Sequence, residues 1–478
     1  MAIKARSSAA VFAAQLTGEV LGLLRNIILA RLLGPAEMGV CAILALTLSL
    51  LDMLSDIGPD RLLIQAEDGD APQFQNTAQA ILAVRGVIST VLLVLLSYSV
   101  AHLLGSPEAQ WQVAVIGFIL FVRSVQNLDL KRFQRTSRFK PQVIADLSAS
   151  VAATVTVLCV APFVRNAWVF VLAGGVQAGV LAIVSHALAE RPYRFAYDRG
   201  IARRLFIFGW PLALNSLLMF GAMQGDRLIV FASATKADLG RYSVAIQLSL
   251  IPVLVLARVV STLCLPVLSR EQSNQAAFNF RLRQAGSLLG SLALAFSLGF
   301  LFLGGVVLRV LYGAEYSISP VLLAWLAVMQ GIRLLRTLPS IAAMSRADSL
   351  NPLISNVLRL LGIAGALVAL KMGGGMEAIA AAGSAGELAA LVGSILLLHQ
   401  RHQVESSPLW RTSGWYLAGV GFAGLWLVAG ERFPVGRWLA AGAALFCLLW
   451  MVQQTWRLYR KPAAAPPVAP NASLPVES

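Results

Sequence analysis

Charged and amide side chains interrupt the apolar stretches of this chain at a few positions, and those positions are where chemistry is expected. In the first stretch Gln15, Glu19, Gly22 and Asn26 recur at helical spacing, so they share one face of a helix, and Arg25 flanks that face. Such groups in an apolar setting usually turn toward a cavity or the interior of a helix bundle. Together they offer ligands for a phosphate, a sugar or a small ion.

A later helix, near residues 204–231, repeats this arrangement. Asn215 and Asp226 are eleven residues apart and share a face, and Arg227 lies beside it. Arginine suits a phosphate ligand because its planar guanidinium donates two parallel hydrogen bonds and stays charged. The candidate cavity residues are Gln15, Glu19, Arg25, Asn26, Arg123, Asn215, Asp226, Arg227, Arg258, Gln330, Arg333 and Arg359.

The same charges have a competing structural interpretation. Intramembrane arginine and aspartate often pair to lock helices, and long side chains near helix ends extend to the interface. Asp52 and Asp56 lie on one stripe of the second apolar stretch, where we expect helix locking or an ion-coupled gate rather than a binding site. Glu19 and Asp226 are the carboxylates that we expect to carry a coupling proton or sodium ion, and no other cofactor is expected.

Those side chains need membrane-spanning helices to position them. Of the 478 residues 58% are hydrophobic and 13% are charged, whereas a soluble protein has about a quarter charged residues. A span needs about 20 mostly apolar residues. This criterion predicts an all-α polytopic membrane protein with about fourteen spans, near 8–33, 36–64, 76–103, 109–130, 140–163, 167–189, 204–231, 240–268, 282–311, 318–344, 350–370, 376–399, 414–430 and 437–456.

We attribute the net charge of +15 to Lys and Arg in cytoplasmic loops, which orient a membrane protein, rather than to binding of a nucleic acid. With the N-terminus inside, the loops near 131–140 and 191–204 collect Lys and Arg on the cytoplasmic side, as the positive-inside rule requires. We therefore expect both termini in the cytoplasm, with 461–478 as a disordered tail. The four cysteines imply no disulfide framework. His399 and His402 predict no metal site, because a ligand set needs three or four residues.

An internal repeat appears at an offset of 201 residues. Residues 25–28 align with 226–229, and residues 36–39 align with 237–240 without a gap. A parallel repeat of six spans indicates a transporter that holds its substrate between two halves. The predicted organisation is a six-helix lobe at 1–198, a second at 199–402, two additional spans at 403–460 and the tail at 461–478.

The segment Leu24–Gly39, with the sequence LRNIILARLLGPAEMG, resembles the opening hairpin of O-antigen and exopolysaccharide repeat-unit flippases. Leu54–Gly58, LSDIG, is similar to the end of their second span. These proteins belong to the MOP exporter superfamily, so the resemblance implies two six-helix lobes around a central cavity and a location in the bacterial inner membrane. It also implies a polyprenyl-pyrophosphate-linked oligosaccharide as substrate, and a polysaccharide polymerase and co-polymerase as candidate partners.

Two transporters of the same superfamily stay open as alternatives, the lipid II flippase and the multidrug exporter. The many arginines favour an anionic substrate over the cations that a multidrug exporter carries. An enzyme such as a polysaccharide polymerase is disfavoured, because no loop is long enough to present catalytic residues outside the membrane. The sequence thus predicts a transporter without catalytic residues.

Overall fold

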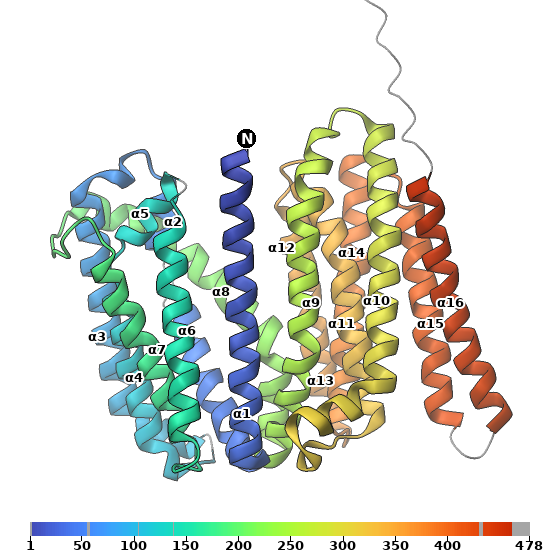
Figure 1. Ribbon diagram of the computed structural model, residues 1–478, viewed down its shortest axis with the longest axis horizontal. Coiled ribbons are helices and arrows are strands. Elements are labelled where there is room, and N and C mark those ends of the chain that lie inside the picture. Colours follow the sequence, from blue (N-terminus) through green and yellow to red (C-terminus); the bar gives the residue numbers. More distant parts are fainter. Residues whose placement is uncertain (1, 55–57, 104, 137, 430–433, 461–478) are drawn as a thin grey trace, which may run out of the picture. The chain divides into compact units, whose positions relative to one another are not determined.

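The computed structural model describes residues 2–54, 58–103, 105–136, 138–429 and 434–460, and within them the regular structure is helical, with no strand (Figure 1). The elements are α1 (Ala2–Leu54), α2 (Pro59–Gln65), η1 (Glu67–Asp70), α3 (Pro72–Leu103), η2 (Pro107–Ala109), α4 (Gln110–Ser124), α5 (Asp129–Arg135), α6 (Lys140–Val160), α7 (Trp168–Ala187), α8 (Arg199–Ser233), α9 (Lys236–Arg270), α10 (Gln275–Tyr312), η3 (Ala314–Tyr316), α11 (Pro320–Met344), α12 (Leu350–Arg359), α13 (Leu361–Lys371), α14 (Met376–His402), α15 (Ser407–Ala429) and α16 (Pro434–Arg460). The predicted all-α fold class is confirmed.

Eleven of the described helical segments are long and apolar enough to cross a membrane, or twelve if the pair α4 and α5, bent by 49°, forms one span. The fourteen predicted spans differ from this number for identifiable reasons. α1 counts once although it holds both the first and the second predicted span, on either side of Gly34. α15 coincides with the predicted span 414–430 but is not among the eleven. The chain is a multi-pass membrane protein.

The helices form two units, each of which is built from three stretches of the chain. Unit 1 comprises Met1–Ile251, Gly304–Leu322 and Ile363–Gly383, and unit 2 comprises Pro252–Leu303, Leu323–Gly362 and Ser384–Ser478. The chain therefore passes from one unit to the other within five helices, namely α9, α10, α11, α13 and α14. The predicted lobes at 1–198 and 199–402 stay a prediction.

Small residues let the helices of unit 1 approach closely. A Cβ atom on Gly86 of α3 would lie 2.0 Å from the Ser124 Oγ of α4, and Thr90 Oγ1 donates to the Gly117 carbonyl at 2.7 Å. Lipid offers apolar side chains no strong reason to leave it, so contacts through glycine and hydroxyl groups stabilise helix pairs in membranes. These contacts pack α3 closely against α4.

The two copies of the sequence repeat touch each other inside unit 1. α1 breaks at Gly34, whose φ of 76° lies in the region that favours glycine, and then continues past Gly39. A Cβ on Gly39 would lie 1.9 Å from the Lys236 carbonyl oxygen, and a Cβ on Gly240 would lie 2.0 Å from the Pro35 carbonyl oxygen. Both pairs are related by the offset of 201 residues, so the contact is reciprocal, as a two-fold relation between the copies requires.

Arg31 and Glu37 form hydrogen bonds that stabilise the turn at Gly34. The Arg31 guanidinium donates to the Val310 and Leu311 carbonyls at the C-terminal end of α10, where a cation is favourable. Glu37 Oε2 accepts a hydrogen bond of 2.8 Å from the Ala167 backbone N–H at the start of α7, where an anion is favourable. Arg31 and Glu37, both within Leu24–Gly39, therefore have structural roles.

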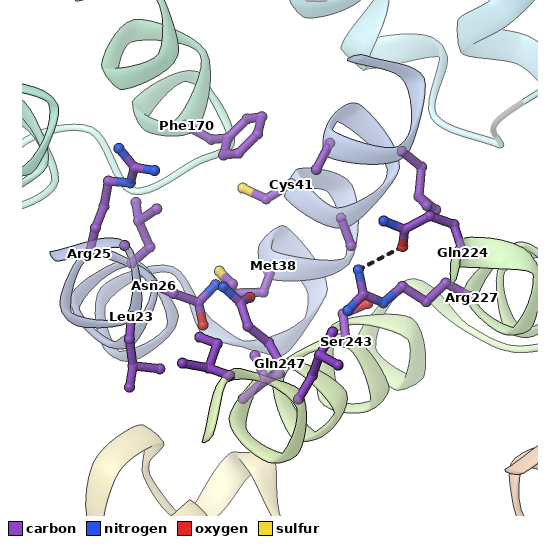
Figure 2. A pocket seen from close by; sticks show the side chains of 18 of the residues that line it. Leu23, Arg25, Asn26, Met38, Cys41, Phe170, Gln224, Arg227, Ser243 and Gln247 are labelled. Atoms are coloured by element: carbon purple, nitrogen blue, oxygen red, sulfur yellow. Dashed lines mark hydrogen bonds between the residues drawn. The ribbon is translucent and has the colours of Figure 1, made fainter. Parts of the chain in front are cut away.

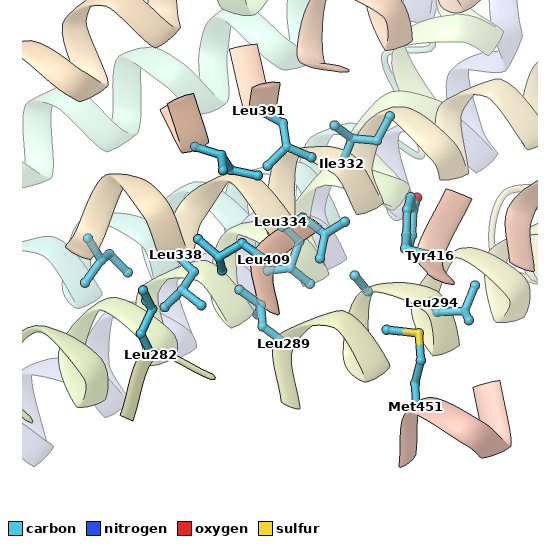
Figure 3. Packing of buried hydrophobic residues seen from close by; sticks show 14 of the residues in the cluster. Leu282, Leu289, Leu294, Ile332, Leu334, Leu338, Leu391, Leu409, Tyr416 and Met451 are labelled. Carbon is cyan, nitrogen blue, oxygen red and sulfur yellow. The ribbon is translucent and has the colours of Figure 1, made fainter. Parts of the chain in front are cut away.

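A large apolar cluster of unit 2 is contributed by α9, α10, α11, α14, α15 and α16 (Figure 3). Leu289 and Leu294 of α10, Leu334 of α11 and Leu391 of α14 are all buried in it. Tyr416 of α15 is also fully buried, and its hydroxyl lies 3.0 Å from Ser297 Oγ, which satisfies the polar end of the ring. α15 and α16 are thus part of the folded core of unit 2.

Candidate functional site

Unit 1 contains a pocket of about 360 Å³ formed by α1, α7, α8 and α9, in which charged and amide side chains interrupt an apolar lining (Figure 2). Both segments of α1 contribute, because the break at Gly34 folds the helix back on itself. The lining residues are Glu19, Gly22, Leu23, Arg25, Asn26, Leu29, Met38, Cys41, Ala42, Ala45, Leu46, Phe170, Gln224, Arg227, Ser243, Val244, Gln247, Leu250 and Ile251.

Two arginines lie on opposite sides of this pocket, Arg25 near Phe170 and Arg227 near Gln224 (Figure 2). Arg25 Nη1 donates to Gln177 Oε1 of α7 at 2.9 Å, and Arg227 Nη1 donates to Gln224 Oε1 at 2.9 Å. Both side chains are half-buried. An amide is neutral, so these two hydrogen bonds orient each guanidinium beside the pocket without adding a negative charge.

Polar atoms between the arginines have unused hydrogen-bonding capacity. Asn26 Oδ1 and Ser243 Oγ are buried and have no hydrogen-bond partner within the described part of the chain. A buried polar atom without a partner costs about 1–3 kcal/mol, so water or a ligand is expected to satisfy it. Gln247 lies one turn beyond Ser243 on α9 and also lines the pocket. The pocket therefore combines positive charge with sites for hydroxyl groups.

Glu19 is the acidic residue of this pocket and lies one turn and a half before Arg25 on α1. A carboxylate and two guanidinium groups leave the lining with a net positive charge. Such a lining attracts an anion, and the carboxylate can accept hydrogen bonds from sugar hydroxyls or take up a proton. Phosphate binding at arginine and hydroxyl binding at amides are the chemistry that the geometry supports.

The predicted face of the first helix corresponds largely to this pocket. Glu19, Gly22 and Asn26 line it, together with the flanking Arg25, whereas Gln15 is exposed one turn earlier.

On α8 the structure brings Arg227 into the pocket but turns its neighbour away. Asp226 Oδ2 accepts a hydrogen bond of 3.2 Å from the hydroxyl of the buried Tyr242, and Asp226 Oδ1 accepts one from the Arg227 backbone N–H. Asn215 is exposed at the surface of α8. Asp226 therefore fixes α8 against α9 in this arrangement, while its role in ion coupling stays a prediction.

Asp52 and Arg123 meet in a second pocket of unit 1, of about 350 Å³. Arg123 Nη1 lies 3.4 Å from Asp52 Oδ2, and Arg85 Nη2 lies 4.0 Å from Asp52 Oδ1. Lys131 Nζ pairs with Asp60 at 3.9 Å in the same pocket. Asp52 thus joins α1 to α3 and α4, which is the geometry that helix locking or a gate needs. Asp56 lies outside the described residues.

In unit 2 the predicted Arg333 and Arg359 surround a single carboxylate. Glu387 of α14 is 1% exposed, and Oε1 lies 2.7 Å from the Nε atoms of both arginines. Arg336 Nε lies 3.3 Å from the other oxygen, Oε2. These three arginines come from α11 and α12 and are themselves largely buried. The cluster joins α11, α12 and α14. Its geometry is therefore that of charges that pair to lock helices together.

The remaining candidates of unit 2 are separate from one another. Gln330 is fully buried on α11, and neither amide atom has a hydrogen-bond partner among the described residues. Arg258 is exposed on α9. His402 Nε2 lies 3.0 Å from Asp348 Oδ2, whereas His399 Nδ1 lies 2.9 Å from the Val404 carbonyl, so the two imidazoles have different partners.

Sequence reasoning missed several residues that the structure places at these sites. Glu387 is an acidic residue inside a predicted span, and a search for carboxylates able to balance the arginines would have found it. Ser243 and Gln247 are four residues apart in an apolar helix, which is a weak but readable signal. Phe170 and Cys41 give no such signal, because apolar residues are everywhere in this chain.

Comparisons with known proteins give a family and similar folds for this chain. The family described as "Polysaccharide biosynthesis protein" matches residues 28–319. A curated relative from Rhizobium meliloti (strain 1021), the succinoglycan biosynthesis transport protein ExoT, is 22% identical over 306 residues. That alignment covers 64% of this chain and 62% of the relative, so it spans less than two thirds of the relative's length.

Two solved structures are similar in fold. The lipid II flippase MurJ in an inward closed conformation has a TM-score of 0.70 and 14% identity, with 95% of this chain and 100% of that chain covered. An inward-facing multidrug resistance MATE family transporter of the MOP superfamily has a TM-score of 0.64 and 15% identity, with 83% and 96% covered. At these identities the similarity concerns the fold.

Proposed function

Because this chain belongs to the polysaccharide biosynthesis protein family, we propose that it moves a polyprenyl-pyrophosphate-linked oligosaccharide repeat unit across a bacterial inner membrane by alternating access. The unit would serve the assembly of an exopolysaccharide, O-antigen or capsule. The proposed activity is transport and not catalysis, with a polysaccharide polymerase and co-polymerase acting downstream on the released unit. A relative in succinoglycan biosynthesis transport supports the pathway class.

One observation carries the proposal, namely the pairing of Arg25 and Arg227 across a pocket that also offers unsatisfied Asn26 and Ser243 atoms. The pyrophosphate of such a lipid is a strong anion, which guanidinium groups bind well. The attached sugar is rich in hydroxyl groups, which amides and the Glu19 carboxylate can bind through many weak contacts. Weak contacts suit transport, since release must follow capture.

The orientation and the energy source belong to the same proposal. Both termini face the cytoplasm, as the distribution of Lys and Arg between the loops favours. Glu19 takes up a coupling proton or sodium ion, because it is the acidic residue among those that line the pocket. Neutralising Glu19 would raise the positive potential of the pocket, so uptake of an ion there favours anion binding.

A complementation experiment tests this function. In a strain that lacks the gene, the lipid-linked oligosaccharide is expected to accumulate on the cytoplasmic face, and the wild-type gene should restore exported polysaccharide. Arg25→Gln and Arg227→Gln should each fail to restore it, whereas Arg165→Gln removes an exposed arginine outside the pocket and should restore it fully.

Two other outcomes would replace the proposal. Unchanged polysaccharide together with altered drug sensitivity would assign the chain to multidrug export. Normal polysaccharide with a defect in cell-wall synthesis would assign it to lipid II, which carries the same pyrophosphate on a different sugar.

A further inference from the structure

A polar pocket of unit 2 lies apart from the residues discussed so far. It occupies about 290 Å³ between α10, α15 and α16. Its polar lining includes Arg283, Arg411, Glu405 and Gln454, and its aromatic lining is Trp415 and Trp450. α15 and α16 follow the predicted repeat, and the proposed transport cycle gives this pocket no role.

The pocket lies at one end of its three helices. Arg283 is eight residues after the start of α10, and Arg411 is four residues after the start of α15. Gln454 is six residues before the end of α16. At 1.5 Å per residue these positions are about 6–12 Å from their helix ends, so in helices that span the bilayer the pocket lies toward one membrane surface rather than at the midplane.

Charge in this pocket is not internally balanced. Arg283 and Arg411 are exposed, and neither guanidinium has a carboxylate within 4.0 Å in the part of the chain that the structure describes. Glu405 is the carboxylate of the lining, and its own backbone N–H donates to Asn279 Oδ1. Two cations and one anion leave a net positive site. By contrast, the three arginines around Glu387 are held at 2.7–3.3 Å from its oxygens.

Aromatic side chains continue from the pocket along α16. The Trp415 and Trp450 rings have centroids 5.9 Å apart, and Trp450 also stacks on Phe446 at 6.2 Å. Phe446 is one turn deeper in α16 and is 57% exposed, so it offers an apolar surface. Tryptophan is enriched at membrane interfaces because its ring is amphipathic. This strip leads from a charged pocket near the helix ends to an exposed apolar side chain near the middle of α16.

We propose that this pocket binds the phosphate of an anionic bilayer phospholipid of the phosphatidylglycerol class, with one acyl chain lying against Trp450 and Phe446. Arg283 and Arg411 donate to the phosphate, and Gln454 and Thr412 bind the glycerol hydroxyl groups. The lipid bridges α10 to the α15–α16 hairpin. The inference does not depend on the proposed function, since it needs neither the transported lipid nor transport.

Native mass spectrometry of the purified full chain in neutral detergent tests the site. Dioleoyl phosphatidylglycerol and dioleoyl phosphatidylcholine are titrated against wild type, Arg283→Gln, Arg411→Gln and the double variant. An arginine near a lipid surface contributes about a fivefold change in anionic lipid binding, so we expect about fivefold weaker phosphatidylglycerol binding for each single variant and about 30-fold for the double variant. Phosphatidylcholine binding should not change.

The matched control is Arg457→Gln/Arg460→Gln, which removes two exposed arginines from the same end of α16 but outside the pocket lining. An equal loss in this control, or full retention by the double variant, would overturn the site. Displacement of phosphatidylglycerol by millimolar inorganic phosphate would also overturn it, by assigning the pocket to a soluble anion. An unchanged melting temperature without lipid, together with binding retained by Arg411→Lys, distinguishes lost recognition from misfolding.

Discussion

Arginines inside apolar helices have two different kinds of partner in this molecule. In unit 1, Arg25 and Arg227 are held by neutral amides and face a pocket with unsatisfied polar atoms. In unit 2, Arg333, Arg336 and Arg359 surround the buried carboxylate of Glu387. The residue type and the apolar setting are the same in both places, and the partner decides which group is available to a ligand.

The difference follows from the cost of burying charge. A buried ion pair gains little net stability, but removing one partner leaves the other charge uncompensated in a medium of low dielectric constant. The three arginines of unit 2 are therefore occupied by the carboxylate of Glu387. Those of unit 1 line a pocket, where their positive charge can act on an incoming anion.

The largest expected effect is on unit 2. Glu387→Gln leaves three arginines close together without a counter-charge, so we expect a loss of about 3–5 kcal/mol in the free energy of unfolding, read as a large drop in melting temperature in detergent. Glu19→Gln, which changes one carboxylate of the unit 1 pocket, is the comparison and should lower the melting temperature much less. Equal melting temperatures for Glu387→Gln and wild type would show that the cluster has no stabilising role.

The next effect concerns the backbone contact that supports the pocket of unit 1. Gly39→Ala and Gly240→Ala each place a Cβ within about 2 Å of a carbonyl oxygen across the helix crossing, so each should cost at least 1–3 kcal/mol of stability. Because the contact is reciprocal, the two losses should be similar in size. Gly299→Ala, which meets no heavy atom within 4 Å, should be neutral, and unequal losses for the first two would contradict the two-fold relation.

A smaller effect, on transport rather than stability, is expected in the pocket itself. A hydrogen bond to a charged group contributes about 1.5–3 kcal/mol, so Arg25→Gln or Arg227→Gln should slow translocation of a lipid-linked oligosaccharide in proteoliposomes by about tenfold or more. Their melting temperatures should stay close to wild type. Arg258→Gln changes an exposed arginine of α9 outside the pocket and is the control. An equally slow translocation in this variant would show that the position of the arginine in the pocket is not what transport requires.

The smallest effect is expected from removing one of the three arginines around Glu387. Arg333→Gln removes one hydrogen bond to Glu387 but also one repulsive charge, and two arginines remain as partners. We expect a loss of about 1 kcal/mol in chemical unfolding, much less than for Glu387→Gln. The double variant Glu387→Gln/Arg333→Gln should be more stable than Glu387→Gln alone, and a fully additive loss would argue against charge repulsion.

Much of the architecture could be predicted from the sequence because the bilayer imposes simple lengths and periods. Helical spacing placed Glu19, Gly22 and Asn26 on one face, and these residues do line one pocket. The offset of 201 residues likewise aligned Gly39 with Gly240, which meet at the crossing. Periodicity within one helix and similarity between two segments are local properties, so a single sequence contains them.

Partner choice could not be predicted in the same way. Asp226 and Arg227 are adjacent, and a helical wheel separates them by only 100°, so small rotations of α8 decide which of them enters the pocket and which meets Tyr242. Arg333 and Arg359 lie on α11 and α12, but their orientation depends on Glu387, which is distant in sequence. Tertiary packing sets such contacts, and one sequence without its fold does not specify them.

The most direct test of the central claim is a binding measurement on the unit 1 pocket. Purified wild type and the Arg25→Gln/Arg227→Gln variant would be titrated with a polyprenyl pyrophosphate and with the uncharged polyprenol of the same length. The account predicts that the variant binds the pyrophosphate at least tenfold more weakly and the polyprenol equally well. Equal pyrophosphate affinity in the two proteins would contradict the claim that this arginine pair receives the anionic headgroup.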